Sequence, residues 1–231
     1  MPYFYIDYYY IILVVPVIIA SLVVQAKLKS TYAKYSKVRN VRNITGAQAA
    51  QMVLNYYGIH NVRVEHVPGS LSDHYDPTSN VIRLSDGVFN NASIAAVGVA
   101  CHEAGHAAQH AEGYMPIKIR NTILPVCNVG SKLSVPLLIL GVIFSFEPLV
   151  WVGIGFFAFT AIFQLVTLPV EFNASNRALA VIESNGLLSF EEKNGAAKVL
   201  KMAAMTYVAA LAVSVAQLLR LILRYSGRRN R

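Results

Sequence analysis

The chain has 231 residues, of which 55% are hydrophobic and only 14% are charged, and its formal net charge is +8. Soluble domains carry about 25% charged residues, so this composition argues against an ordinary soluble protein. No Gly-Lys-Ser/Thr phosphate motif or RNA-binding aromatic motif occurs, and we therefore expect no nucleic-acid partner. Long uncharged runs indicate an integral membrane protein whose partner is the lipid bilayer.

The first uncharged run, Tyr8–Ala26, is long enough to cross about 30 Å of hydrocarbon as a helix. The residues before it lack the positive charge of a secretory signal. Basic residues follow it instead: Lys27, Lys29, Lys34, Lys37, Arg39 and Arg42. Residues 1–26 are therefore predicted to form an N-terminal transmembrane anchor and not a cleaved signal peptide.

A polar stretch over residues 27–120 has the patterns of a small α+β domain. In chain order the patterns predict a helix from Thr45 to Gly58, strands over Asn61–Val67 and Val81–Leu84, and a helix from Ser93 to about Gly113. The segment PGSLSDHYDPTSN between the strands is interpreted as a loop. We expect the Val81–Leu84 strand to be the sheet edge on which an extended peptide lies. Two cysteines, Cys101 and Cys127, are too few for a disulfide framework.

Residues 121–170 are predicted to form a transmembrane hairpin. Its polar break is Phe146-Glu147-Pro148, and the uncharged run Leu149–Val170 follows. A new helix and a turn are then expected over residues 171–201, with Pro169 suited to the first turn of that helix. Residues 202–231 are an apolar helix with a basic tail. This helix is a fourth span, or else packs against the others or lies in the interface.

The run VGVACHEAGHAAQH contains His102-Glu103-x-x-His106. Residues four apart on a helix share one face, so two imidazoles can reach one metal ion. The adjacent glutamate can then handle the proton of a metal-activated water. About 0.005 chance matches are expected in a chain of this composition, which makes the pattern specific. The alternative is a pair of histidines on an amphipathic helix, without metal.

A catalytic zinc usually takes three protein ligands, so one more is needed. His110 lies about 12 Å along the helix axis from His102, too far to share the ion. The acidic candidates are Glu112, Glu147, Glu171, Glu183, Glu191 and Glu192. Two spans return the chain to the starting side of the membrane at Glu171, whereas Glu147 lies at the opposite side. We therefore predict Glu171 as the third ligand, the alternative being a mere interfacial charge.

The motifs HEAGH and EFNASNRAL, separated by a membrane hairpin, resemble the bacterial YugP-like membrane zinc metallopeptidases, which are similar to the HtpX/Ste24 gluzincins. The resemblance covers nearly the whole chain. It implies Zn²⁺ held by His102, His106 and Glu171, with Glu103 as the catalytic glutamate. The chain departs from the related patterns at Asn173 and Ser175, where Asp is expected, and both bear on how a ligand is oriented.

The expected fold is therefore α+β: a mainly helical integral membrane protein with three to four spans and a zincin-like metallopeptidase domain. The expected function is a membrane-anchored zinc endopeptidase that hydrolyses protein or peptide substrates with Glu103 as general base. Arg177, His74 and Tyr75 are candidates for oxyanion or substrate contacts. The resemblance implies a bacterial cell membrane, and the basic flanks favour a catalytic domain on the cytoplasmic side. No oligomeric state is predicted.

Two other functions compete with this one. The first is an intramembrane zinc protease with its metal helix inside the bilayer. The second is a catalytically silent membrane scaffold that binds metal without hydrolysis, or binds none. Against the first, the histidine helix has polar flanks and no Asp-Gly ligand motif follows in the later runs.

Overall fold

The computed structural model describes residues 7–226. The chain divides into two compact units. The helical unit comprises the described parts of Met1–Val24, Ile119–Thr167 and Thr206–Arg231. The mixed unit comprises Gln25–Lys118 and Leu168–Met205. The mainly helical fold predicted from the sequence is confirmed.

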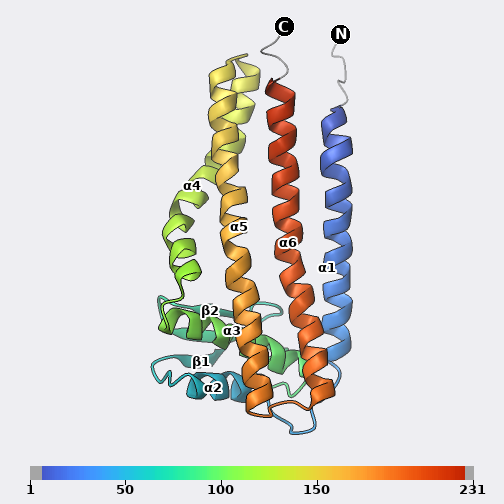
Figure 1. The fold of residues 1–231 in the computed structure, drawn as a ribbon, viewed down its shortest axis with the longest axis vertical. Coiled ribbons are helices and arrows are strands. Elements are labelled where there is room, and N and C mark those ends of the chain that lie inside the picture. Colours follow the sequence, from blue (N-terminus) through green and yellow to red (C-terminus); the bar gives the residue numbers. More distant parts are fainter. Residues whose placement is uncertain (1–6, 227–231) are drawn as a thin grey trace. The chain divides into compact units, whose positions relative to one another are not determined.

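Four helices within the described residues are long and apolar enough to cross a membrane. They are α1 (Val15–Tyr35, preceded by a π-helical turn, Tyr10–Val14), α4 (Met115–Ile143), α5 (Glu147–Ser184) and α6 (Phe190–Ser226). In the helical unit they run alongside one another (Figure 1). The apolar stretch from Met202 is therefore part of a fourth helix able to span.

The helical unit is held by apolar packing and by one ion-pair cluster. Val150 and Ile154 of α5 pack with Leu221 and Tyr225 of α6. The carboxylate of Asp7 pairs with the guanidinium groups of Arg220, at 2.7 Å, and Arg224. Removing three charges from water is costly unless they are paired, so this cluster ties the start of the first helix to the end of the last.

The prediction of a new helix near Pro169 is wrong, because α5 runs unbroken from Glu147 to Ser184 with Pro169 in its interior. Proline lacks the N–H for one helical hydrogen bond, but a long apolar helix tolerates this when its neighbours hold it in place. Glu171 is consequently carried on the same helix as the apolar run before it.

Local capping explains the two shorter helices of the mixed unit. Thr45 opens α2 (Gly46–Tyr56) with a capping box, in which its hydroxyl accepts from Gln48 N–H and the Gln48 side chain accepts from Thr45 N–H. Gly58, at φ +65°, ends it. Ser93 caps α3 (Ile94–Ala111) by accepting from the N–H of Ala96 at 3.2 Å. The predicted helix starts are confirmed.

The mixed unit contains a three-stranded sheet in the order β1-β3-β2. The strands are β1 (Arg63–His66), β2 (His74–Asp76) and β3 (Val81–Leu84). β3 pairs in parallel with β1 and antiparallel with β2. The predicted edge position of Val81–Leu84 is therefore wrong, since β3 is the central strand. The edge strands are β1 and β2, and β2 lies in the segment that we interpreted as a loop.

The sheet and both short helices share one core. Ile82 and Leu84 of β3 are fully buried with Val53 and Leu54 of α2 and with the small residues of α3. The side chain of Arg83 points to the opposite face of the sheet, toward side chains of β2. Burial of alternate residues fixes the register of β3, because a slip of one residue would turn this apolar face outward. The register in turn sets where β2 lies along α3.

Candidate metal centre

Helix α3 presents His102 and His106 on one face, one turn apart. Their ring centroids are 4.7 Å apart and their planes are nearly perpendicular. The two side chains are only 15% and 12% exposed. Two imidazoles held this close, with little access to water, offer a preformed pair of nitrogen ligands.

Glu171 of α5 supplies a carboxylate to this pair. Its Oε2 lies 3.4 Å from Nε2 of His102 and 3.7 Å from Nε2 of His106. One ligand atom from each residue lies within 4.8 Å of the other two. The structure thus brings together the three residues that the sequence analysis selected from distant parts of the chain.

A glycine between the histidines makes this approach possible. A Cβ atom on Gly105 would lie 2.7 Å from the carbonyl oxygen of Ala174 on α5. No larger residue fits there without moving one helix from the other. Gly105 therefore lets α5 come close enough for Glu171 to reach both rings.

A hydrogen bond fixes the orientation of the His106 ring. Its Nδ1 lies 3.0 Å from Oε1 of Gln109, an oxygen that can only accept, so Nδ1 carries the hydrogen. The amide of Gln109 is itself fixed, because its nitrogen donates to the carbonyl of Val170 and to Oδ1 of Asn173. The lone pair of His106 Nε2 is thereby directed at Glu171, as metal ligation requires.

The His102 ring has a comparable partner on α5. Its Nδ1 lies 3.1 Å from the hydroxyl oxygen of Ser175. A hydroxyl can accept a hydrogen bond, so Ser175 is able to hold the ring hydrogen on Nδ1 and leave Nε2 for a metal. The two positions at which the chain departs from the related patterns, Asn173 and Ser175, therefore both serve the histidines.

Arg177 lies behind this arrangement and not among the three ligand atoms. Its Nε donates to Oδ1 of Asn173 at 2.7 Å, and one Nη pairs with Glu112 at 2.7 Å. A continuous chain of contacts thus runs from Glu112 through Arg177, Asn173 and Gln109 to His106. Sequence reasoning missed Gln109, although its position three residues after His106 on a helix was a usable signal.

The electrostatics of the pocket favour a cation. Burial alone would lower the pKa of His106, but the nearby carboxylates of Glu171 and Glu103 outweigh burial and raise that pKa. When both rings carry their hydrogen on Nδ1, the two Nε2 atoms and a carboxylate oxygen of Glu171 present three lone-pair donors to one another. A set of two imidazole nitrogens and one carboxylate oxygen fits Zn²⁺.

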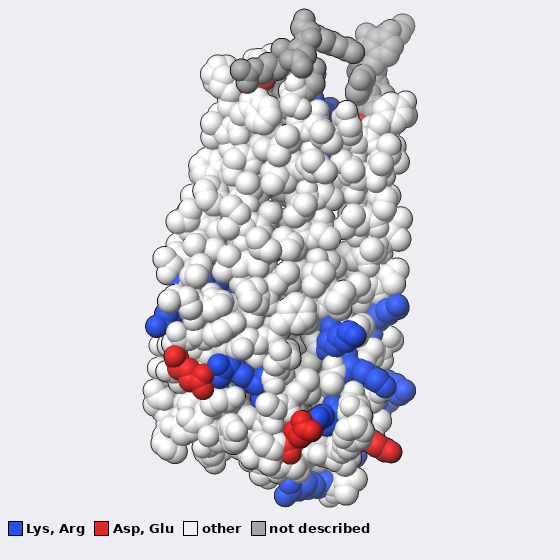
Figure 2. Space-filling model, in the orientation of Figure 1, with Lys and Arg blue, Asp and Glu red and all other residues white. Residues whose placement is uncertain are grey.

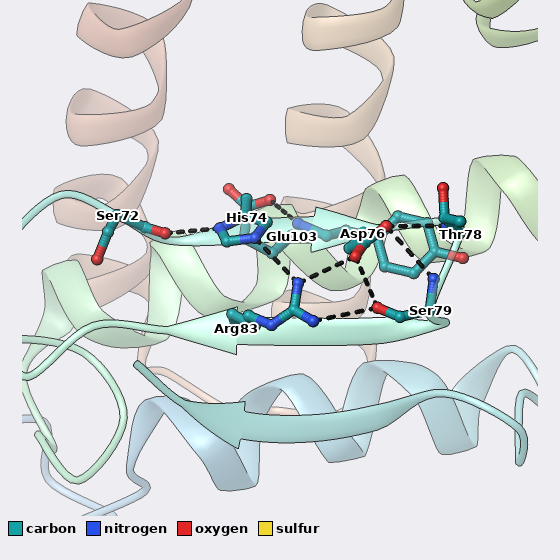
Figure 3. A network of polar contacts seen from close by, with 8 residues as sticks. Ser72, His74, Asp76, Thr78, Ser79, Arg83 and Glu103 are labelled. Atoms are coloured by element: carbon teal, nitrogen blue, oxygen red, sulfur yellow. Dashed lines mark hydrogen bonds and ion pairs between the residues drawn. The ribbon is translucent and has the colours of Figure 1, made fainter. Parts of the chain in front are cut away.

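Glu103 lies next to His102 on α3 and faces the edge strand. Its Oε2 accepts a hydrogen bond 3.0 Å long from the backbone N–H of Tyr75 in β2 (Figure 3). The Tyr75 ring lies against His110, with centroids 6.1 Å apart, and its hydroxyl contacts Asn80. Tyr75 therefore contacts Glu103 through its backbone N–H. No sequence pattern indicated this contact.

The remaining candidate, His74, belongs to a polar network on β2 and β3 (Figure 3). Its Nδ1 lies 2.7 Å from the carbonyl oxygen of Ser72, and its Nε2 lies 3.4 Å from Arg83. Arg83 also pairs with Asp76 at 3.0 Å. Hydrogen bonds from Ser79 and Arg83 hold the pKa of Asp76 well below its usual value. This network stabilises β2, the strand whose backbone donates a hydrogen bond to Glu103.

Sequence comparisons identify the family of the chain. The chain is similar to a protein of Bacillus subtilis (strain 168) named "Putative membrane protease YugP", with 44% identity over 206 residues that cover 89% of this chain and 92% of the relative. No solved structure matches the chain. The family described as "Putative neutral zinc metallopeptidase" matches residues 10–226. The resemblance to YugP-like proteins is thus confirmed, and the chain belongs to this zinc metallopeptidase family.

Proposed function

We propose that the chain is a membrane-anchored zinc endopeptidase in which His102, His106 and Glu171 hold Zn²⁺. The convergence of their three ligand atoms within 4.8 Å supports this most strongly. Nitrogen and oxygen donors from three side chains leave a coordination position for water or substrate, as catalytic zinc sites do. When bound, zinc supplies Lewis acidity to a carbonyl oxygen and to water.

Glu103 is the general base of this proposal. Its hydrogen bond to Tyr75 uses Oε2, and among the described residues its Oε1 has no hydrogen-bond partner. Oε1 is thus available to accept the proton of the water that attacks the scissile carbonyl, and to return it to the leaving amine. The charge of Glu103 also acts on the His106 ring and helps to raise its pKa, which supports a position of this carboxylate near the proposed ligands.

The substrate lies along β2 in this proposal. β2 is a sheet edge, and the N–H of Tyr75 points from it toward Glu103. An extended peptide pairs with such an edge through backbone hydrogen bonds, which suits unfolded or membrane-proximal protein segments. Residues 27–120 and 171–201 then form the zincin-like part, and residues 1–26, 121–170 and 202–231 form the membrane part.

Charge supports a cytoplasmic position for the zincin-like part. The loops that carry it have twelve Lys and Arg residues near the apolar runs, against five in the C-terminal tail. The twelve are Lys27, Lys29, Lys34, Lys37, Arg39, Arg42, Lys118, Arg120, Arg177, Lys193, Lys198 and Lys201, and the five are Arg220, Arg224, Arg228, Arg229 and Arg231. By the positive-inside rule the richer side is cytoplasmic.

The test is a comparison of purified wild type with Glu103→Gln on an unfolded protein substrate such as casein. We expect equal zinc content and a loss of cleavage of about 10²–10⁴-fold, because the amide cannot accept the water proton. Cleavage by Glu103→Gln at the wild-type rate would rule out this base. Zinc binding without cleavage by either protein would favour the scaffold function.

A further inference from the structure

A pocket of about 390 Å³ lies between α1 and α6 in the mixed unit. It is lined by Thr31, Lys34, Tyr35, Lys198, Lys201 and Met202. The two helices are in close contact beside it, because a Cβ atom on Gly195 would lie 2.7 Å from the ring of Tyr35. The pocket is therefore built by two packed helices and not by a loop.

The charged lining of this pocket has one sign. Lys34, Lys198 and Lys201 are its only charged residues, and all three are exposed. Within residues 7–226 no carboxylate forms an ion pair with any of them, whereas the neighbouring Lys193 pairs with Glu183 at 2.9 Å. Three ammonium groups around one cavity repel one another, and an anion placed between them removes that repulsion.

The pocket lies close to the ends of two apolar runs, where lipid headgroups are expected. Lys201 directly precedes the apolar run that begins at Met202, and Lys34 is eight residues beyond the run that ends at Ala26. At about 1.5 Å per residue, the lysines lie within roughly 12 Å of the ends of the two apolar runs. Figure 2 shows basic side chains gathered over this region of α1 and α6.

We propose that this pocket binds the phosphate group of an anionic phospholipid. The three ammonium groups and the Thr31 hydroxyl donate hydrogen bonds to the phosphate oxygens. Met202 and Tyr35 provide apolar surface for the glycerol and the first carbons of the acyl chains. Basic pockets between membrane helices on the cytoplasmic side, where the leaflet is anionic, suit such headgroups.

The experiment uses the full-length chain in detergent, titrated with phosphatidylglycerol or with phosphatidylcholine of the same acyl chains, and bound lipid is counted by native mass spectrometry. We expect wild type to prefer phosphatidylglycerol at least about tenfold. Replacing Lys34, Lys198 and Lys201 with Gln should weaken phosphatidylglycerol binding by about fivefold per lysine, on the order of a hundredfold for all three. The corresponding triple Arg variant should retain binding, because it keeps the charge.

The matched control removes the same charge elsewhere, with Lys29→Gln, Lys37→Gln and Arg63→Gln, and should bind as wild type does. Thermal unfolding checks that each variant is folded, and the single variant Lys198→Gln serves if the triple is not. Equal binding of the two lipids by wild type, or equal losses in the pocket and control variants, would overturn the proposal. Displacement of the lipid by millimolar inorganic phosphate would assign the pocket to a soluble anion and also refute it.

Discussion

The backbone N–H of Tyr75 donates a 3.0 Å hydrogen bond to the carboxylate of Glu103, which joins the edge strand to the proposed general base. A hydrogen bond to a charged group contributes about 1.5–3 kcal/mol. It fixes one oxygen of Glu103 and leaves the other available to the water of the proposed mechanism. The strand that receives substrate in our proposal therefore also positions the base.

Replacing Tyr75 with proline tests this relationship, because proline has no N–H to donate. We expect Tyr75→Pro to lower kcat/KM about tenfold or more relative to Tyr75→Ala, which loses the ring but keeps the donor. Zinc content and thermal unfolding should be the same in both variants. If the two variants cleave substrate equally well, the N–H of Tyr75 does not position Glu103.

Gln109 should control metal affinity through His106. In Gln109→Leu the ring loses the acceptor for its Nδ1–H, so the orientation of Nε2 is no longer fixed. Loss of such a partner typically weakens metal binding about 10–100-fold, which competition with a zinc chelator measures. Gln51→Leu, on the exposed face of α2, is the matched control and should bind zinc as wild type does. An unchanged affinity in Gln109→Leu would contradict the role of the amide.

Replacing Gly105 should weaken both the packing of α3 against α5 and the binding of zinc. The added Cβ of Gly105→Ala would lie 2.7 Å from the carbonyl oxygen of Ala174, so α3 and α5 must separate. We expect a loss of about 1–3 kcal/mol in the free energy of unfolding, together with weaker zinc binding. Gly155→Ala on the same α5 is the control, since no atom lies within 4 Å of its added Cβ. Thermal unfolding in detergent with and without zinc distinguishes the two.

The sequence predicted the features of the site that depend on local pattern and on topology. HEAGH places two histidines on one helix face, and the hairpin returns Glu171 to the same side of the membrane. β2 was not predicted, because it has only three residues within a turn-rich segment and forms by pairing with β3. The contacts of Gln109 with Val170 and Asn173 were also missed, since they depend on how closely α3 and α5 pack.

The pH dependence of the chain's stability should depend in part on Asp76 in β2. Its pKa in the folded chain is lowered from 3.8, chiefly by hydrogen bonds from Ser79 and Arg83. A lowered pKa means that the ionised carboxylate stabilises the fold above pH 3.8, and that this stabilisation is lost as the pH falls through the lower folded value. Asp76→Asn should therefore be less stable than wild type at pH 7, and the difference should shrink as the pH falls below about 4.

Thermal unfolding as a function of pH measures this difference. Glu65→Gln provides the control, because Glu65 forms only an exposed pair with Arg63 at 3.4 Å. If Asp76→Asn and wild type remain separated by the same amount from pH 7 down to the most acid pH that both tolerate, the contacts of Asp76 do not stabilise the ionised form.

The zinc K-edge X-ray absorption spectrum of purified Glu103→Gln protein tests the central claim most directly, because this variant keeps every proposed ligand and does not digest itself. We expect one zinc per chain, with two imidazole nitrogens at about 2.0–2.1 Å and oxygen ligands at about 2.0–2.2 Å. Replacing Glu171 with Ala in the same protein should remove an oxygen ligand or the metal itself. A spectrum without imidazole, or one that Glu171→Ala leaves unchanged, would contradict the proposed site.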